Sequence, residues 1–119
     1  KHVLHTNAPG PGTKPTDAAE TMAYKLALGD YAYKAHIDSI KSMTGHMLGA
    51  AGAAEAIATI LALRNGIVPP TINLDTPDPE CDLDYTPNKA VKADLTIGIS
   101  DSLGFGGHDA CVAFRKYTE

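Results

Sequence analysis

Apolar residues recur along the chain with changing periodicity, which predicts strands and helices in turn. Residues 2–6 form a short strand-like run, and Pro and Gly then interrupt residues 7–16 and predict a loop. Apolar residues at helical spacing follow, in a helix that Asp17 opens with a capping box and Gly29 ends. Residues 35–40 predict the next strand. The chain is therefore expected to start as strand, helix, strand.

The longest apolar segment runs from Gly45 to Gly66 and consists mostly of Ala, Gly, Leu and Ile. Glu55 is its only charged residue before Arg64. A helix that is apolar on every side is typical of a buried helix, and Gly66 takes the position that ends it. Glycines on neighbouring turns of this helix predict close backbone packing against a sheet; they are Gly45, Gly49 and Gly52.

Pro residues and a hairpin pattern organise the C-terminal part of the chain. Residues 69–70 and 75–79 are rich in Pro and bracket an extended piece, residues 71–74, that cannot be helical. Residues 95–100 and 110–115 are apolar and β-branched, and the loop between them is short enough for an antiparallel hairpin. We predict an α/β layer that is incomplete on its N-terminal side.

The composition excludes several classes of function. The 119 residues are 44% hydrophobic, so they can bury a core as one domain or part of one. The net charge of −4, with both signs interspersed, gives no reason to expect nucleic acid or a membrane surface as a partner. The apolar segment carries His46 and Glu55, which is typical of a core helix rather than a bilayer span. Cys81 and Cys111 have no metal or redox spacing, so we expect a reducing cytoplasm.

Lys41 and His46 stand at the threshold of the long apolar helix and are the first candidates for chemistry. Thr44 is placed as an N-cap, so His46 is expected in the first turn, where the helix dipole disfavours a second positive charge. We expect a neutral imidazole that donates a hydrogen bond, which is the form that polarises a carbonyl. Two simpler interpretations stay open: His46 is a capping or core histidine, and Glu55 is a buried carboxylate paired with Lys41.

The glycine-rich loops do not match nucleotide-binding motifs. In residues 11–14 the Lys and Thr are in the wrong order for a phosphate-binding loop, and residues 104–107 lack the dinucleotide spacing. The glycines of the second loop are typical of a tight turn that needs positive φ, whereas Phe105 among them is suited to act as a mobile gate. The five histidines have no ligand spacing and no companion Cys or Asp, so we predict no metal site.

Four motifs of this chain resemble the β-ketoacyl-acyl-carrier-protein synthases. They are Lys-Ser-Met-Thr-Gly-His followed by Gly-Ala-Ala-Gly and a Glu, and the stretches at residues 68–74, 80–85 and 102–108. The resemblance covers essentially all of residues 1–119 and corresponds to the C-terminal part of the type II condensing enzymes of fatty-acid elongation. It implies a thiolase-like α/β fold, of which this chain is the C-terminal half, with a mixed sheet packed on helices. The nucleophilic cysteine is then expected in an N-terminal half outside this chain, because Cys81 and Cys111 lack its context.

The resemblance also implies a role for individual residues. Lys41 matches the active-site lysine, and His46 matches the second catalytic histidine, whose Nε2 would bond the thioester oxygen and stabilise the enolate. Glu55 matches a buried carboxylate that supports the lysine and the histidine, and Phe105 matches the aromatic gate of the acyl pocket. The substrate-binding residues that it implies are Thr13, for the pantetheine arm, and Phe105, Gly106 and Gly107.

The first loop departs from the family pattern at two positions. Where the family reads Asn-Ala-His-Gly-Thr, this chain reads Asn-Ala-Pro-Gly-Pro, so Pro9 replaces the first catalytic histidine and Pro11 replaces a pantetheine-binding threonine. Proline has no side-chain donor, and losing one donor of an oxyanion site costs about 10²- to 10³-fold in rate. Asp101 and Asp109 stand where asparagine is expected and add negative charge near the Phe105 loop.

The reaction that the resemblance implies is a decarboxylating Claisen condensation of an acyl-enzyme with malonyl-acyl-carrier-protein. The parent protein is then an acyltransferase of fatty-acid synthesis, a 3-oxoacyl-[acyl-carrier-protein] synthase, without a cofactor beyond the phosphopantetheine arm that carries its substrates. The expected partners are acyl carrier protein, the chain's own N-terminal half and a second copy in a homodimer. We expect the isolated chain to be inactive.

Two alternatives stay open at this point. The chain is a catalytically dead homologue that serves as a binding or dimerisation module, as Pro9 would permit. The other alternative is a polyketide ketosynthase or a thiolase-like relative, which would differ mainly in the shape of its acyl pocket.

Overall fold

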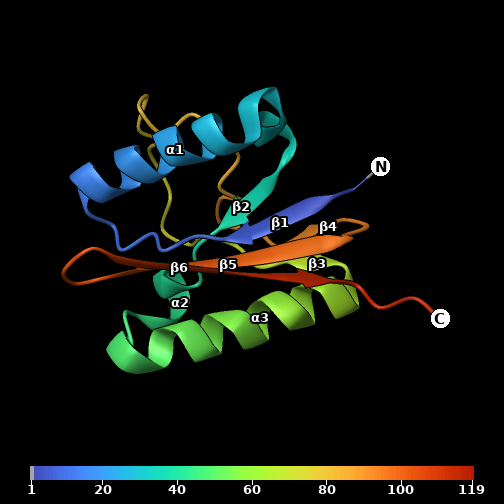
Figure 1. Ribbon diagram of the computed structural model, residues 1–119. Coiled ribbons are helices and arrows are strands. Elements are labelled where there is room, and N and C mark those ends of the chain that lie inside the picture. The colour runs from blue at the N-terminus through green and yellow to red at the C-terminus, as the bar shows by residue number, and fades with distance from the viewer. Residues whose placement is uncertain (1) are drawn as a thin grey trace.

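A computed structural model describes residues 2–119, and its strands form a main sheet and a small two-stranded ribbon (Figure 1). The elements, in chain order, are β1 (Leu4–Asn7), α1 (Lys14–Leu28), the 3-10 helix η1 (Gly29–Lys34), β2 (His36–Asp38), α2 (Lys41–Thr44), the 3-10 helix η2 (Leu48–Ala50), α3 (Ala51–Asn65), β3 (Ile67–Val68), β4 (Val91–Lys92), β5 (Ile97–Gly104) and β6 (His108–Arg115). The main sheet has the strand order β2-β1-β5-β6. Because β1 is parallel to β2 and β5 while β6 is antiparallel to β5, the predicted mixed sheet is confirmed.

Helices cover both faces of the main sheet, α1 on one side and α3 on the other (Figure 1). The contact between α3 and β5 is close. A Cβ atom built on Gly98 of β5 would lie 2.7 Å from Thr59 and 3.1 Å from Leu63 of α3. Real Cβ atoms do not approach other atoms that closely, so a glycine is required where this helix lies on the sheet.

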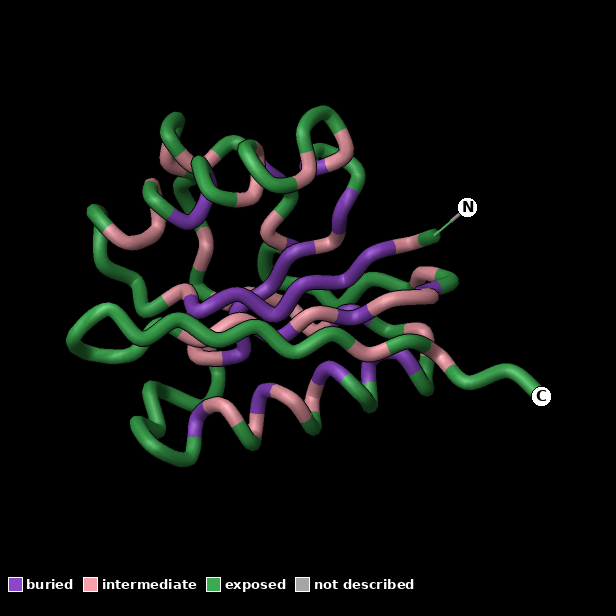
Figure 2. The backbone as a smooth tube through the Cα atoms, viewed as in Figure 1, coloured by how far each residue is buried: buried purple, intermediate pink, exposed green. Residues whose placement is uncertain are grey.

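The two faces of the sheet differ in chemistry. Side chains of paired residues point to the same face, so the strand register assigns each residue to one helix or the other. The face toward α1 is apolar, and its buried cluster comprises Leu4, Ala8, Ala32, Ala35, Ile37 and Leu83. The face toward α3 is polar where β1 and β2 end, and its buried residues there are His5, Asn7, Asp38 and Ser100. The buried parts of the tube in Figure 2 follow β1, β2 and the inner side of α3.

The predicted strands at residues 2–6 and 35–40 are confirmed as β1 and β2, but α1 begins earlier than predicted. It starts at Lys14, with Thr13 as the N-cap and Pro at an N-terminal position of the helix. Proline is tolerated there because its missing N–H would have no partner in the first turn. Residues 14–16, predicted as loop, are therefore helical. The ribbon of β3 and β4 was not predicted.

The apolar segment that begins at Gly45 is not a single helix. Gly45 has a φ of +72°, which interrupts the helical conformation, and α3 starts only at Ala51. Thr44 is the last residue of α2, and its hydroxyl donates to the carbonyl of Ile40 at 3.1 Å instead of capping a following helix. The predicted end is confirmed, since Gly66 has the left-handed conformation of a C-cap.

The close packing predicted for three glycines is wrong for two of them. A Cβ atom on Gly45 or Gly49 would meet nothing within 4 Å, and on Gly52 it would lie an ordinary 3.6 Å from Ser102 Oγ. The close approach occurs instead at Gly98, across the interface from α3. The glycine spacing along the sequence did not indicate which side of that interface needs the small residue.

The predicted antiparallel hairpin is confirmed, with longer strands than expected. Pairing of β5 and β6 extends to Gly104, so the predicted loop of residues 101–109 shrinks to a turn of residues 105–107. Gly106 and Gly107 have φ values of +85° and +81°, as a tight turn requires. Gly104 lies within the strand, so the expectation of positive φ is wrong for this glycine.

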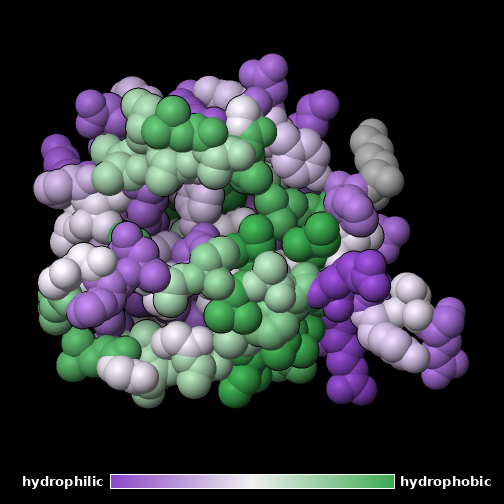
Figure 3. Space-filling model, viewed as in Figure 1, coloured by the Kyte–Doolittle hydropathy of each residue, from purple (hydrophilic) through white to green (hydrophobic). Residues whose placement is uncertain are grey.

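One face of α3 is exposed in this chain, contrary to the expectation of a helix buried on all sides. Ile57, Ile60 and Leu61 are exposed, as are Val112 on β6 and Leu103 on β5. Hydrophobic side chains gather over β6 and α3 in Figure 3. Cys81 and Cys111 are free thiols. Among residues 2–119, every helix is too short or too polar to cross a lipid bilayer.

Thr6 offers a test of the two-faced sheet. It is 1% exposed, pairs with Ile37 and Ile99 on the apolar face, and its Oγ1 has no hydrogen-bond partner in the described chain. Thr6→Val should therefore raise the free energy of unfolding by about 1 kcal/mol, because it removes an unpaired buried hydroxyl at constant shape. Urea denaturation measures the change. Thr21→Val is the matched control and should destabilise, because the Thr21 hydroxyl donates to the Asp17 carbonyl at 3.0 Å; a loss of stability in Thr6→Val would contradict the assignment.

Candidate active site

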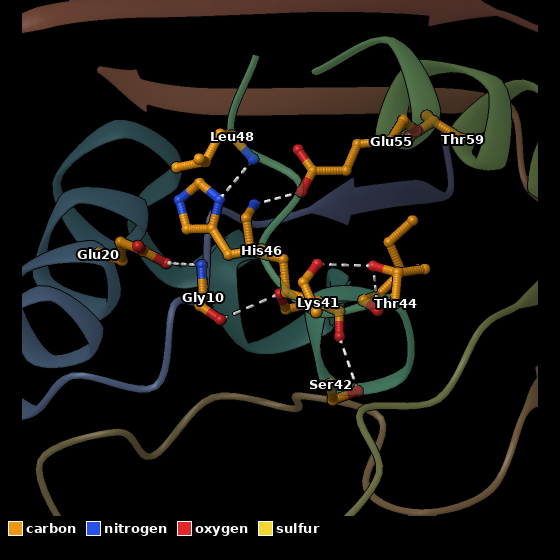
Figure 4. Close-up of polar contacts among 12 residues, drawn as sticks. Gly10, Glu20, Lys41, Ser42, Thr44, His46, Leu48, Glu55 and Thr59 are labelled. Carbon is orange, nitrogen blue, oxygen red and sulfur yellow. Dashed lines mark hydrogen bonds and ion pairs between the residues drawn. The ribbon is translucent and has the colours of Figure 1, made fainter. Parts of the chain in front are cut away.

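A buried ion pair joins Lys41, at the start of α2, to Glu55 on the inner side of α3 (Figure 4). Lys41 Nζ donates to Glu55 Oε1, and the two side chains are only 9% and 2% exposed. The interpretation of Glu55 as a buried carboxylate paired with Lys41 is thereby confirmed. Each charge is compensated by the other, so the chain can keep both out of water.

His46 follows α2 and lies outside any helix, with its side chain exposed. The expected place in the first turn of the long helix is wrong, because Gly45 separates His46 from α2 and η2 precedes α3. His46 Nδ1 accepts the backbone N–H of Leu48 at 3.0 Å (Figure 4). A ring nitrogen that accepts a hydrogen bond carries no proton, so this contact favours a neutral imidazole with its proton on Nε2. The hydrogen bond from the Leu48 amide, and not a helix dipole, therefore favours the form in which His46 Nε2 donates.

Lys41 and His46 line one cavity of about 660 Å³. The loop after β1 contributes Gly10 and Pro11 to the lining of this cavity, and residues between 71 and 87 contribute as well. The cavity therefore collects the candidate lysine, the candidate histidine and the loop in which the sequence departs from the family pattern.

Backbone and side-chain hydrogen bonds hold the loop that carries Pro9. Ala8 N–H donates to the carbonyl of Asp38 at 2.7 Å, and Ser39 Oγ donates to the carbonyl of Gly10 at 3.2 Å. Gly10 has a φ of +36°, and a Cβ atom there would lie 2.5 Å from Ser39 Cβ. A side chain at position 10 would collide with Ser39, so the observed loop conformation requires glycine there.

Pro9 lines a second cavity of about 430 Å³ between α1 and the β5–β6 hairpin, together with Tyr24 and Asp101. Tyr24 Oη donates to Asp101 Oδ2 at 2.9 Å. Burial, and then the charge of Asp101, raise the pKa of Tyr24. Burial also raises the pKa of the Cys111 thiol to about 11, with a hydrogen bond to Asp101 as the next cause. A thiol with so high a pKa is a poor nucleophile at neutral pH.

The remaining predicted substrate-binding residues lie outside the first cavity. Thr13 is exposed at the start of α1, and its Oγ1 donates to Thr16 Oγ1 at 2.8 Å. Phe105 is 93% exposed at the tip of the hairpin, next to Gly106 and Gly107. The structure brings the lysine, the histidine and the supporting glutamate together and leaves these four residues apart from them.

Glu20 is a site candidate that the sequence did not single out. It is 7% exposed and lines both cavities; its Oε2 accepts the N–H of Gly10 at 3.1 Å, and its Oε1 has no partner in the described chain. Burial raises the pKa of Glu20 to about 7, against the lowering effect of the Gly10 hydrogen bond. The capping box predicted for Asp17 is wrong, because α1 already begins at Lys14. The three-residue spacing of Asp17 and Glu20 is also that of a capping box, so the sequence did not indicate the contact between Glu20 and Gly10.

Residues 2–119 contain no cluster of three or more His, Cys, Asp or Glu side chains placed to hold a metal ion.

The sequence of this chain is similar to a known protein family and to its members. Residues 1–75 match the family described as beta-ketoacyl synthase, C-terminal domain. The chain is 50% identical over 115 residues to the 3-oxoacyl-[acyl-carrier-protein] synthase 2 of Synechocystis sp., a match that covers 97% of this chain and 28% of the relative.

Solved structures of ketosynthases share the fold. A type II polyketide-synthase ketosynthase, solved in complex with its acyl carrier protein, matches with a TM-score of 0.93 and 41% identity over 97% of this chain and 28% of that chain. A beta-ketoacyl synthase from Burkholderia phymatum STM815 matches with a TM-score of 0.90 and 36% identity over 98% of this chain and 28% of that chain.

The fold is that of the thiolase-like ketosynthases, of which this chain matches a part. This chain belongs to the beta-ketoacyl synthase family, and its residues correspond to the C-terminal part of the relatives. It spans about 28% of the length of the curated relatives that it matches.

Glu20 should make the stability of this chain depend on pH. Its folded pKa of about 7 lies above the ordinary value of 4.5, so the folded state binds the proton more tightly. This contribution is fully present below about pH 4.5 and is lost as the pH rises through about 7, a decrease of up to about 3 kcal/mol. Urea denaturation between pH 4.5 and 8 should show the decrease in the parent chain and a smaller slope in Glu20→Gln. The exposed Glu80→Gln is the control, and equal slopes in all three chains would refute the assignment.

Removing only one partner of the buried Lys41–Glu55 pair should destabilise the fold. Glu55→Gln leaves an unpaired buried ammonium group and should lower the free energy of unfolding by about 3 kcal/mol, whereas Lys41→Met combined with Glu55→Leu should restore part of the loss. Asp82→Asn removes an exposed pair with Lys25 and should have a much smaller effect, because solvent screens that pair. Chemical denaturation compares the four chains; equal losses in Glu55→Gln and Asp82→Asn would show that the buried pair has no special weight.

Proposed function

We propose that this chain supplies the malonyl-handling part of the active site of a 3-oxoacyl-[acyl-carrier-protein] synthase. The observation that carries the proposal is the placement of Lys41, held by the buried Glu55, in the same cavity as His46, whose Nδ1 accepts the Leu48 amide and leaves Nε2 to donate. The identity of 50% to a synthase of this name supports it.

The geometry fits a decarboxylating Claisen condensation. Malonyl-acyl-carrier-protein loses carbon dioxide, and the electrons of the broken C–C bond form an enolate with a negative oxygen. His46 Nε2–H donates to that oxygen, and the Lys41 ammonium group in the same cavity adds a positive potential. The enolate carbon then attacks an acyl group carried on a cysteine outside this chain, which forms the new C–C bond of the 3-oxoacyl product and releases the thiolate.

The partners in this proposal follow from the reaction. Acyl carrier protein delivers both substrates on its phosphopantetheine arm, and no further cofactor takes part. A relative solved in complex with its acyl carrier protein supports this partner. An N-terminal half that provides the nucleophile, a homodimeric assembly and a cytoplasmic location belong to the same proposal. The isolated chain is expected to be inactive, because the proposed nucleophile lies in the N-terminal half and neither Cys81 nor Cys111 has the sequence context of the family's nucleophile.

Pro9 weakens the proposed activity. It stands where the first catalytic histidine is expected, and its ring has neither donor nor acceptor. The surroundings are acidic as well, because Glu20 and Asp101 line the same cavity as Pro9. A developing negative oxygen next to this wall would lack one donor and meet two carboxyl groups.

Two alternatives each have an observation in their favour. The loss of the donor at Pro9 favours a catalytically inactive homologue that keeps the fold and its binding surfaces. The similarity to a polyketide-synthase ketosynthase, with 41% identity, supports the alternative of a polyketide ketosynthase. The second alternative keeps the same roles for Lys41 and His46.

A fusion of this chain to the remaining part of the Synechocystis sp. synthase tests the proposal. Decarboxylation of malonyl-acyl-carrier-protein should be slow in the fusion and should rise about 10²-fold in Pro9→His, because the second oxyanion donor is restored. His46→Ala in the Pro9→His fusion should abolish the gain. Radiolabelled carbon dioxide release measures each rate.

Two results would separate the alternatives in this experiment. Full activity with Pro9 in place would contradict the weakened site. No activity in either version, with the fusion folded, would favour the binding module over the enzyme.

A further inference from the structure

A second buried pair of titratable side chains, distinct from Lys41 and Glu55, lies between the sheet and α3. His5 on β1 and Asp38 on β2 are both 0% exposed, and His5 Nε2 lies 2.5 Å from Asp38 Oδ1. Both side chains lie on the polar face of the sheet, the face on which α3 places Glu55. No step of the proposed reaction uses either residue.

Burial of the His5–Asp38 pair costs free energy of folding. His5 Nδ1 and Asp38 Oδ2 have no hydrogen-bond partner in the described chain, nor do Oδ1 and Nδ2 of the neighbouring Asn7. Burial raises the pKa of Asp38, while the hydrogen bond and the charge of His5 lower it. Apolar residues of similar size would fill the same space without unpaired atoms, so packing alone gives no reason for a histidine and an aspartate here.

The position of the pair connects it to the candidate active site. β1 leads from His5 into the Pro9 loop, and β2 leads from Asp38 through Ser39 to Lys41. The Asp38 carbonyl accepts the Ala8 N–H at 2.7 Å, so the same residue joins both strand ends through its backbone and its side chain. A displacement of β2 against β1 would move Lys41 relative to the loop, which lines the same cavity with Gly10 and Pro11.

We infer that His5 and Asp38 form a positioning pair for the active site, which fixes the points where the Pro9 loop and Lys41 leave the sheet. The catalytic consequence rests on the proposed function, but the effect on Lys41 does not. Without the pair, the Lys41 ammonium group should lose its fixed contact with Glu55 and become more accessible. Misplacement of a catalytic group by about 1 Å can cost about 10²-fold in rate.

Chemical labelling of Lys41 tests the inference in this chain itself. Brief acetylation with acetic anhydride, read by peptide mass spectrometry, gives the labelling of Lys41 relative to the exposed Lys89. The ratio should rise about 10-fold in Asp38→Asn and in His5→Gln, under conditions in which circular dichroism shows the chains folded. Thr6→Val, on the same strand but on the apolar face, is the matched control and should leave the ratio unchanged.

The outcomes separate positioning from a merely structural role. An unchanged ratio in folded His5→Gln would overturn the inference, even if Asp38→Asn failed to fold. In the fusion that carries Pro9→His, Asp38→Asn should lower kcat about 10- to 100-fold with little change in KM. A raised labelling ratio together with fusions that are inactive in every version would support the positioning pair and count against the proposed function.

Discussion

The buried pair of Lys41 and Glu55 is the interaction on which the site depends. A lysine ammonium group that is 9% exposed is tolerated only because a carboxylate neutralises it, so α2 and α3 must keep their relative placement for either charge to remain buried. That placement also determines where the chain passes through Gly45 to His46. The pair thus holds a cation beside the imidazole without itself facing solvent.

The two faces of the sheet have different roles: one packs the apolar core, and the other carries the polar groups near the candidate site. Toward α1 the buried cluster is aliphatic, and its burial favours folding without specific contacts, although the buried Thr6 also lies on this face. Toward α3 the strand ends present polar and charged groups, which cost free energy wherever an atom stays unpaired. The same alternation of side chains along β1 produces both faces, because Leu4 and Thr6 point one way and His5 and Asn7 the other. The candidate site therefore lies at the end of the sheet where polar residues replaced part of the core.

The loop after β1 keeps a set of hydrogen bonds with Pro9 in place. The backbone of Ala8 and Gly10 bonds to Asp38, Ser39 and Glu20, and no side-chain atom of position 9 takes part in these bonds. The bonds that hold this loop to β2, Ser39 and α1 therefore need no polar side chain at position 9.

The sequence by itself determined β1, α1 and β2 in this order, the hairpin and the family, and it selected Lys41, His46 and Glu55 as site candidates, because these depend on local periodicity and on contiguous motifs. It placed His46 in the wrong local structure, since the apolar pattern continues across Gly45 and hides the interruption between α2 and α3. Only the tertiary structure brought Glu20 to Gly10 and His5 to Asp38, because these side-chain contacts join different segments of the chain. Such contacts leave no periodic signal, because periodicity records which face a residue occupies and not which atom it meets there.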